Sequence, residues 1–125
     1  MLFKKFQGVE MRKLLLLAVA STFSVGAWAS CDNVPAHSAE ACYDKEVTTL
    51  KKQLNQVYAR LYRQTNAKNE LDNAQKSWLT YKEKQCGDFT LAESGSSSGQ
   101  AIFDLSCQSN LLKSRINYLK SITLN

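Results

Sequence analysis

The sequence has few of the residues that usually carry out catalysis or bind metals. It contains one histidine, His37, and its four cysteines include no C-x-x-C pair. Zinc sites need several Cys or His ligands at close spacing, so no metal site is expected. If the cysteines form two disulfides, no thiol is left as a nucleophile. We therefore expect no catalytic residue, no cofactor and no enzyme activity.

Proline and long apolar runs are also scarce. Pro35 is the only proline, and it precedes the part of the chain that has helical periodicity. The apolar run at residues 14–20 is far shorter than the roughly 20 residues that span a bilayer, and no other segment approaches that length. The sequence therefore predicts no transmembrane segment.

The N-terminal segment has the features of a secretory leader. Arg12 and Lys13 precede the apolar run, and Ala27 and Ala29 are the small residues that a signal peptidase requires. Residues 1–29 are thus predicted to be a signal peptide, and residues 30–125 a single periplasmic or secreted domain. Because a complete leader begins at Met11, we expect Met11 to be the true start; the alternative is a long N-terminal extension of the leader.

Much of the net positive charge lies in this leader. The whole chain has a net charge of +5, and the leader holds four basic side chains against one acidic one. Residues 30–125 keep 12 basic and 10 acidic side chains, a net charge of +2. Nucleic-acid binding normally requires a concentrated basic face, so no nucleic-acid partner is expected.

Three segments have the periodicity of amphipathic helices. The first, at residues 40–64, spaces its apolar residues by three or four: Val47, Leu50, Leu54, Val57 and Leu61. The second, at residues 69–85 with Asn69 as N-cap, carries Leu71, Ala74, Trp78 and Tyr81. The third, near residues 102–122, carries Ile102, Leu105, Leu112, Ile116 and Leu119. Without competing strand patterns, we expect an all-α fold, a small antiparallel three-helix bundle stapled by two disulfides.

The segment at residues 87–100 lacks apolar spacing and is predicted to be a loop. Its most polar part is a candidate partner-binding loop, formed by Ser94, Gly95, Ser96, Ser97, Ser98, Gly99 and Gln100. The alternative is a slack linker between two cysteines.

The four cysteines allow three disulfide pairings, and the predicted bundle gathers all of them at one end. We favour the local set, Cys31 with Cys42 and Cys86 with Cys107, because each bond then staples a loose segment. Cys31 also follows a sequence similar to a lipoprotein processing site, with Trp28 where leucine is usual. Lipidation at Cys31 would leave one odd thiol, so it is the less favoured alternative.

The order of residues between these cysteines resembles that of the LprI-like family of secreted bacterial proteins, named for a lysozyme inhibitor. The resemblance covers Cys31 to about Lys120 and rests on the cysteines with Leu54, Asn55, Tyr58, Leu61, Ala74, Gln75, Trp78, Tyr81, Arg115 and Leu119. Lys82 and Glu83 stand where the family often has Arg-Asp, and Leu112 stands where Thr is frequent.

The resemblance implies a helical envelope protein that binds lysozyme, and the alternative is an envelope interaction protein with another partner. Most of the shared residues are expected to be structural. We expect Tyr58, Trp78 and Tyr81 in the core. Asn55 and Gln75 either bond between helices or remain exposed. Arg115 is expected to pair with an acid beside the helix seam, and the alternative is partner recognition.

Overall fold

The computed structural model describes residues 31–95 and 99–124. The predicted signal peptide at residues 1–29 and three residues of the predicted loop, Ser96, Ser97 and Ser98, lie outside the described residues. The chain divides into two compact units, Met1–Val34 and Pro35–Asn125. The described residues of the first unit, 31–34, form a turn, and the second unit contains the helices.

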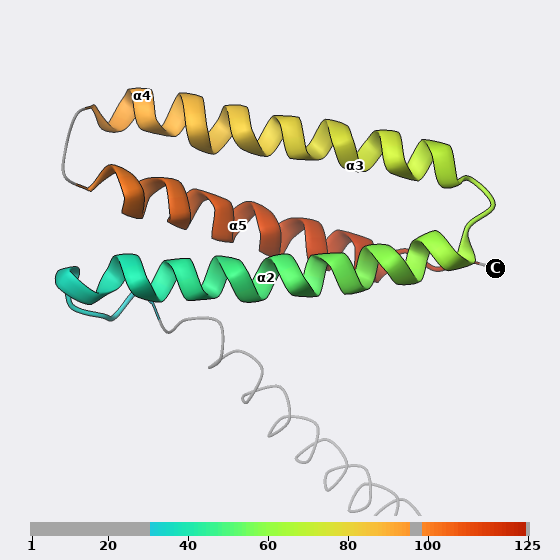
Figure 1. Cartoon of the computed structure of the whole chain (residues 1–125), viewed down its shortest axis with the longest axis horizontal. Helices are drawn as coiled ribbons and strands as arrows, with labels where there is room; N and C mark the ends of the chain where they lie inside the picture. The colour runs from blue at the N-terminus through green and yellow to red at the C-terminus, as the bar shows by residue number, and fades with distance from the viewer. Residues whose placement is uncertain (1–30, 96–98, 125) are drawn as a thin grey trace, which may run out of the picture. The chain divides into compact units, whose positions relative to one another are not determined.

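The second unit is an antiparallel three-helix bundle, as predicted (Figure 1). Its elements are α2 (Ala36–Gln64), α3 (Lys68–Lys82), the π-helix η1 (Glu83–Phe89), α4 (Thr90–Ser94) and α5 (Gln100–Ser121). α3, η1 and α4 follow one another without a break and form one long rod that runs antiparallel to α2. α5 then runs antiparallel to that rod and packs along α2. No strand occurs in residues 31–95 and 99–124.

The core lies between α2 and α5. Its buried members are Val47, Leu50, Leu54, Leu61, Leu112, Ile116 and Leu119. All seven belong to the predicted apolar stripes, which the structure confirms. Full burial of one leucine contributes about 2 kcal/mol to folding. Beside this core, Lys113 of α5 forms an ion pair with Glu46 of α2 at 2.7 Å, which adds a polar link between the same two helices.

Two predicted helix starts differ from the structure. α2 begins at Ala36, directly after Pro35, so His37 lies in its first turn and is exposed, not in a segment before the helix. α3 begins at Lys68, so Asn69 is not its N-cap. The backbone N–H of Ala67 instead donates to Oγ1 of Thr65 at 2.9 Å, which organises the turn before α3.

The prediction of a loop at residues 87–100 is largely wrong, because the chain stays helical as far as Ser94. At η1 the backbone hydrogen bonds follow the π-helical pattern, in which an N–H donates to the carbonyl five residues earlier. The N–H of Thr90, for example, donates to the carbonyl of Gln85. The Thr90 hydroxyl donates to the same carbonyl at 2.8 Å and contacts Sγ of Cys107 at 3.6 Å. A π-turn absorbs an extra residue without ending a helix, so Gly87 does not act as a stop signal here.

A disulfide joins Cys86 of η1 to Cys107 of α5, with the two Cα atoms 5.5 Å apart. This is the pairing that we favoured for these two cysteines. Cys31 and Cys42 are also in disulfide form, and no described cysteine is free. The pairing of Cys31 with Cys42 remains a prediction.

The buried face of α3 is rotated from the predicted stripe. Leu71 and Trp78 pack against the core as expected, but Ala74 is exposed and Tyr81 is 51 % exposed. Lys82 is buried instead. Placing Tyr81 in the core was therefore wrong. The residues of α3 that are at least half-buried include 71, 75, 78 and 82, which are also three or four apart, so spacing alone does not distinguish this face from the predicted one.

Candidate functional site

The connection that contains the predicted partner-binding loop is shorter in the structure than predicted from the sequence. Ser94 ends α4 and Gln100 begins α5, so only residues 95–99 connect the two helices. Gly95 has a φ of +67°, a conformation that favours glycine. Nε2 of Gln100 donates to the Gly95 carbonyl, and the Ser94 hydroxyl donates to the Leu91 carbonyl at 3.0 Å. Both ends of the loop are thus held by hydrogen bonds.

Two exposed aromatic residues flank this loop. Phe89, the last residue of η1, is 59 % exposed, and Phe103, in the first turn of α5, is 49 % exposed. The carboxylate of Glu93 lies between them in the chain and is also exposed. We call the described residues Phe89, Glu93, Gly95, Gly99 and Phe103 the loop-end surface. Exposed aromatic side chains are typical of binding surfaces.

Phe89 and Phe103 were not among the residues predicted from the sequence to form a site. Neither residue belongs to a predicted apolar stripe, and both lie within seven residues of the serine-rich loop. Large aromatic residues outside the stripes were the available signal, because a bundle buries what lies on its stripes and exposes the rest.

The shared family residues divide between the core and the surface. Leu54 and Leu119 are buried in the core. Tyr58 is half-buried and its ring lies 6.0 Å from that of Tyr62, whereas Asn55 is exposed. A structural role therefore holds for the two leucines, but not for Asn55.

Gln75, Trp78 and Arg115 form one cluster that links α3 to α5. Arg115 donates to Oε1 of Gln75 from Nε at 3.1 Å and from Nη2 at 3.0 Å. Its guanidinium carbon lies 5.8 Å from the centroid of the Trp78 ring. Burial lowers the pKa of Arg115, and the hydroxyl of Tyr118 acts in the opposite direction. The prediction of an acidic partner was wrong: the acceptor is a neutral amide, which keeps the guanidinium charged without a second buried charge.

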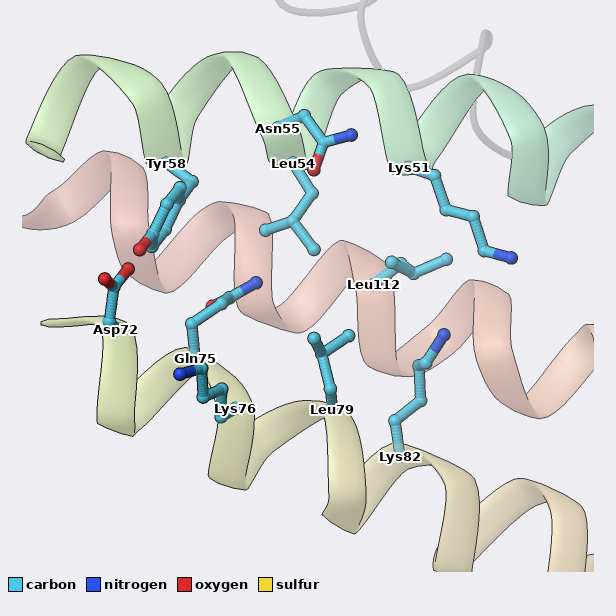
Figure 2. A pocket seen from close by; sticks show the side chains of 10 residues that line it. All are labelled: Lys51, Leu54, Asn55, Tyr58, Asp72, Gln75, Lys76, Leu79, Lys82 and Leu112. Atoms are coloured by element: carbon cyan, nitrogen blue, oxygen red, sulfur yellow. The ribbon is translucent and has the colours of Figure 1, made fainter.

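A groove lies between α2 and α3, with α5 as its floor (Figure 2). Its volume is about 450 Å³. Leu54 of α2, Leu79 of α3 and Leu112 of α5 line its centre. Leu79 is exposed because it faces this groove and not the core. The groove exists because α2 and α3 do not approach closely along their backbones.

Charged side chains lie along the groove, and three of them are lysines: Lys51, Lys76 and Lys82. Lys51 of α2 and Lys82 of α3 lie at one end, whereas Tyr58 and Asp72 lie at the other, with the tyrosine hydroxyl directed toward the carboxylate (Figure 2). Lys82 is only 9 % exposed. Burial lowers its pKa, and the charge of Lys51 lowers it further.

Two carboxylates partly offset the charge of Lys82. Glu83 and Asp104 line a neighbouring pocket of about 380 Å³ that shares Lys51 and Lys82 with the groove, and both raise the pKa of Lys82. The net direction is nevertheless downward. Within the described residues, neither carboxylate forms an ion pair with Lys82, and its Nζ lies 6.0 Å from the centroid of the Trp78 ring. Lys82 is therefore a largely buried cation, without an ion pair in that part of the chain, that lines both the groove and the neighbouring pocket.

The described residues contain no group of His, Cys, Asp and Glu side chains that could hold a metal ion. Within the same residues, no helix is long and apolar enough to cross a membrane.

Comparison with known proteins identifies the family. Residues 31–119 match the family described as "Lysozyme inhibitor LprI". Neither the curated proteins nor the solved structures give a match. The matched region contains all four cysteines, the three helices up to Leu119, the loop-end surface and the groove. The chain therefore belongs to the LprI family of lysozyme inhibitors.

Proposed function

We propose that this protein binds a lysozyme outside the cytoplasm and inhibits it by occupying its sugar-binding cleft. The observation that carries the proposal is the family match over residues 31–119. Disulfides persist in oxidising compartments, where lysozymes act, and the disulfide between Cys86 and Cys107 supports this location.

We assign the contact to the loop-end surface and the loop that it flanks. A plug for an enzyme cleft should be narrow and held in place before binding, because ordering a slack loop costs free energy. The Cys86–Cys107 disulfide and the bond from Gln100 to Gly95 hold both sides of this loop. Phe89 and Phe103 offer apolar area beside it.

The charge of this surface also supports the proposal. A net charge of +2 on residues 30–125 gives no long-range attraction to a basic lysozyme. Asp88 and Glu93 are both exposed near the loop, however, so the local charge is acidic where contact is proposed. Local complementarity of this kind guides orientation and raises association rates.

The test is lysis of a peptidoglycan suspension by several lysozymes of different net charge, with increasing amounts of the oxidised protein spanning residues 30–125. We expect inhibition that saturates at a fixed molar ratio. Replacement of Ser94 to Gln100 by a glycine linker, or the double change Phe89→Ser and Phe103→Ser, should raise the half-inhibitory concentration by roughly tenfold or more.

Tyr81→Ser is the matched control, because Tyr81 is about as exposed as Phe103 but lies outside the loop-end surface. It should inhibit like the unmodified protein. If a protein that is folded by circular dichroism inhibits none of the lysozymes, the inhibitor proposal is wrong. Recovery of other envelope proteins by cross-linking would then favour an interaction protein with a different partner.

A further inference from the structure

The cation of Lys82 forms no ion pair within the described residues, and the carboxylates of Glu83 and Asp104 offset its charge only in part. Its side chain is nine-tenths buried, and the groove adds a second cation, Lys51, whose charge lowers the pKa of Lys82 further. Both ammonium groups lie at the same end of the groove (Figure 2). Burying a charge without a partner is costly, and two like charges at one site increase that cost. An anionic group between Lys51 and Lys82 would offset both.

The rest of the groove is not shaped for a simple inorganic anion. Leu54, Leu79 and Leu112 form an apolar patch next to the two lysines. Toward the far end, Asp72 and Lys76 contribute one charge of each sign, so the excess of positive charge is confined to the end with Lys51 and Lys82. The groove therefore fits a ligand with one anionic end and an apolar body.

Amide side chains on both walls indicate what kind of ligand this is. Asn55 projects from α2 and Gln75 from α3 (Figure 2). Oε1 of Gln75 already accepts two bonds from Arg115, which fixes the orientation of the amide and leaves its N–H groups for another acceptor. Paired amide groups match the carbonyl and N–H groups of a peptide backbone, whereas an alkyl chain would leave them without partners.

We propose that the groove between α2 and α3 binds the C-terminal end of a peptide, with the free carboxylate between Lys51 and Lys82 and an apolar last side chain on Leu54, Leu79 and Leu112. Lys51 and Tyr58 are seven residues apart on α2, which corresponds to about 10 Å along the helix. Three extended peptide residues cover about 10 Å. The volume of about 450 Å³ is also in the range of small-ligand sites.

This site does not depend on the proposed inhibition of lysozyme. The groove and the loop-end surface share no residue, so a peptide can bind whether or not a lysozyme does. Loss of one activity with retention of the other would show the two sites to be separate.

The test is a titration of the ¹⁵N-labelled protein, residues 30–125, with the tripeptide acetyl-Ala-Ala-Leu bearing a free carboxylate, followed by the amide spectrum. We expect saturable shifts of the backbone signals of Leu54, Gln75 and Leu79. The same tripeptide with a C-terminal amide should bind at least tenfold more weakly, because it has no charge for the lysines to meet. Equal affinity of the two tripeptides would overturn the proposal.

Variants of the lysines locate the carboxylate. Lys51→Met and Lys82→Met should each weaken binding of the free tripeptide by roughly tenfold, because a charged hydrogen bond is worth about 1.5 kcal/mol or more. Lys51 is exposed, so its replacement tests the site without disturbing the core. Lys84→Met, which changes an exposed lysine outside the groove, is the control and should bind normally.

A titration with octanoate distinguishes a peptide site from a site for a free fatty acid. Octanoate has the carboxylate and an apolar body but no backbone amides, and we expect it to bind more weakly than the tripeptide. Octanoate that binds more tightly, with the same dependence on Lys51 and Lys82, would contradict a peptide site. Full binding of the tripeptide by both lysine variants would do so as well.

Discussion

Arg115 and Gln75 join α5 to α3 through two hydrogen bonds that converge on one amide oxygen. The residues are 40 positions apart in the sequence. Their pairing holds α3 across the bundle from α5 at the place where the groove opens, and the Trp78 ring lies beside the guanidinium. This contact therefore supports the fold and also orients one wall of the groove.

Gln75→Leu should destabilise the protein, because it leaves the partly buried guanidinium of Arg115 without its acceptor. We expect a loss of about 1.5–3 kcal/mol in the free energy of unfolding, measured by urea denaturation. In a double-mutant cycle, Arg115→Met combined with Gln75→Leu should cost less than the sum of the single changes. Additive losses would mean that the two hydrogen bonds contribute no coupling.

Lys82→Met should change how stability depends on pH. Burial lowers the folded-state pKa of Lys82 below its value of 10.5 in the unfolded chain, so the unfolded chain binds the proton more tightly. Protonation thus penalises the fold below the lowered pKa, and the penalty disappears as the pH rises through that pKa toward 10.5. We expect Lys82→Met to be more stable than the unmodified protein at pH 7, with a difference that shrinks as the pH approaches 10.5.

Denaturant titrations at pH 7, 8, 9 and 10 measure this difference. Lys84→Met is the control, since this exposed lysine has no burial to relieve. A stability difference for Lys82→Met that stays constant over the series would show that the ammonium of Lys82 is not penalised by burial.

Ser109→Ala should stabilise the protein. Ser109 is 1 % exposed, and its hydroxyl has no hydrogen-bond partner among residues 31–95 and 99–124. Removing an unsatisfied buried hydroxyl should raise the free energy of unfolding by about 1 kcal/mol. Ser114→Ala, at an exposed position of the same helix, separates this gain from the higher helix propensity of alanine, which is worth at most about 0.5 kcal/mol. Equal gains in stability at both positions would show that burial of the Ser109 hydroxyl does not destabilise the protein.

Removal of the Cys86–Cys107 disulfide should have a large effect on stability. The bond closes a loop with a sequence separation of 21. A loop of this length predicts a loss of about 3 kcal/mol when both cysteines become alanine. Thermal unfolding of the double variant followed by circular dichroism measures the loss, and an unchanged melting temperature would contradict it.

The remaining disulfide should join Cys31 to Cys42. Proteolysis of the unreduced protein followed by mass spectrometry should yield one linked peptide pair that contains these two residues. A lipid-modified Cys31, or a cross-link from Cys42 to any other cysteine, would refute the local pairing.

The helical pattern was predictable because local spacing decides it. Val47, Leu50, Leu54 and Leu61 repeat at three or four residues and are all buried, as are Leu112, Ile116 and Leu119. Side chains at this spacing share one face of a helix, so the stripe alone indicates both the helix and the side that packs. The family resemblance, which depends on the order of cysteines and motif residues, was predictable for the same reason and is confirmed.

The second half of the rod and the groove were not predictable in this way. The π-turn at η1 carries the helix past Gly87, which reads as a stop signal in the sequence, although the disulfide from Cys86 to Cys107 was the favoured pairing. α3 also exposes Tyr81 and buries Lys82, although the predicted face and the observed face both have helical spacing. The sequence by itself thus determined the three helices, their core stripes and the family, because these follow from spacing along the chain. Only the tertiary structure decided which side of α3 faces the bundle and that Lys82 and Lys51 lie at the same end of the groove, because these depend on contacts between distant residues.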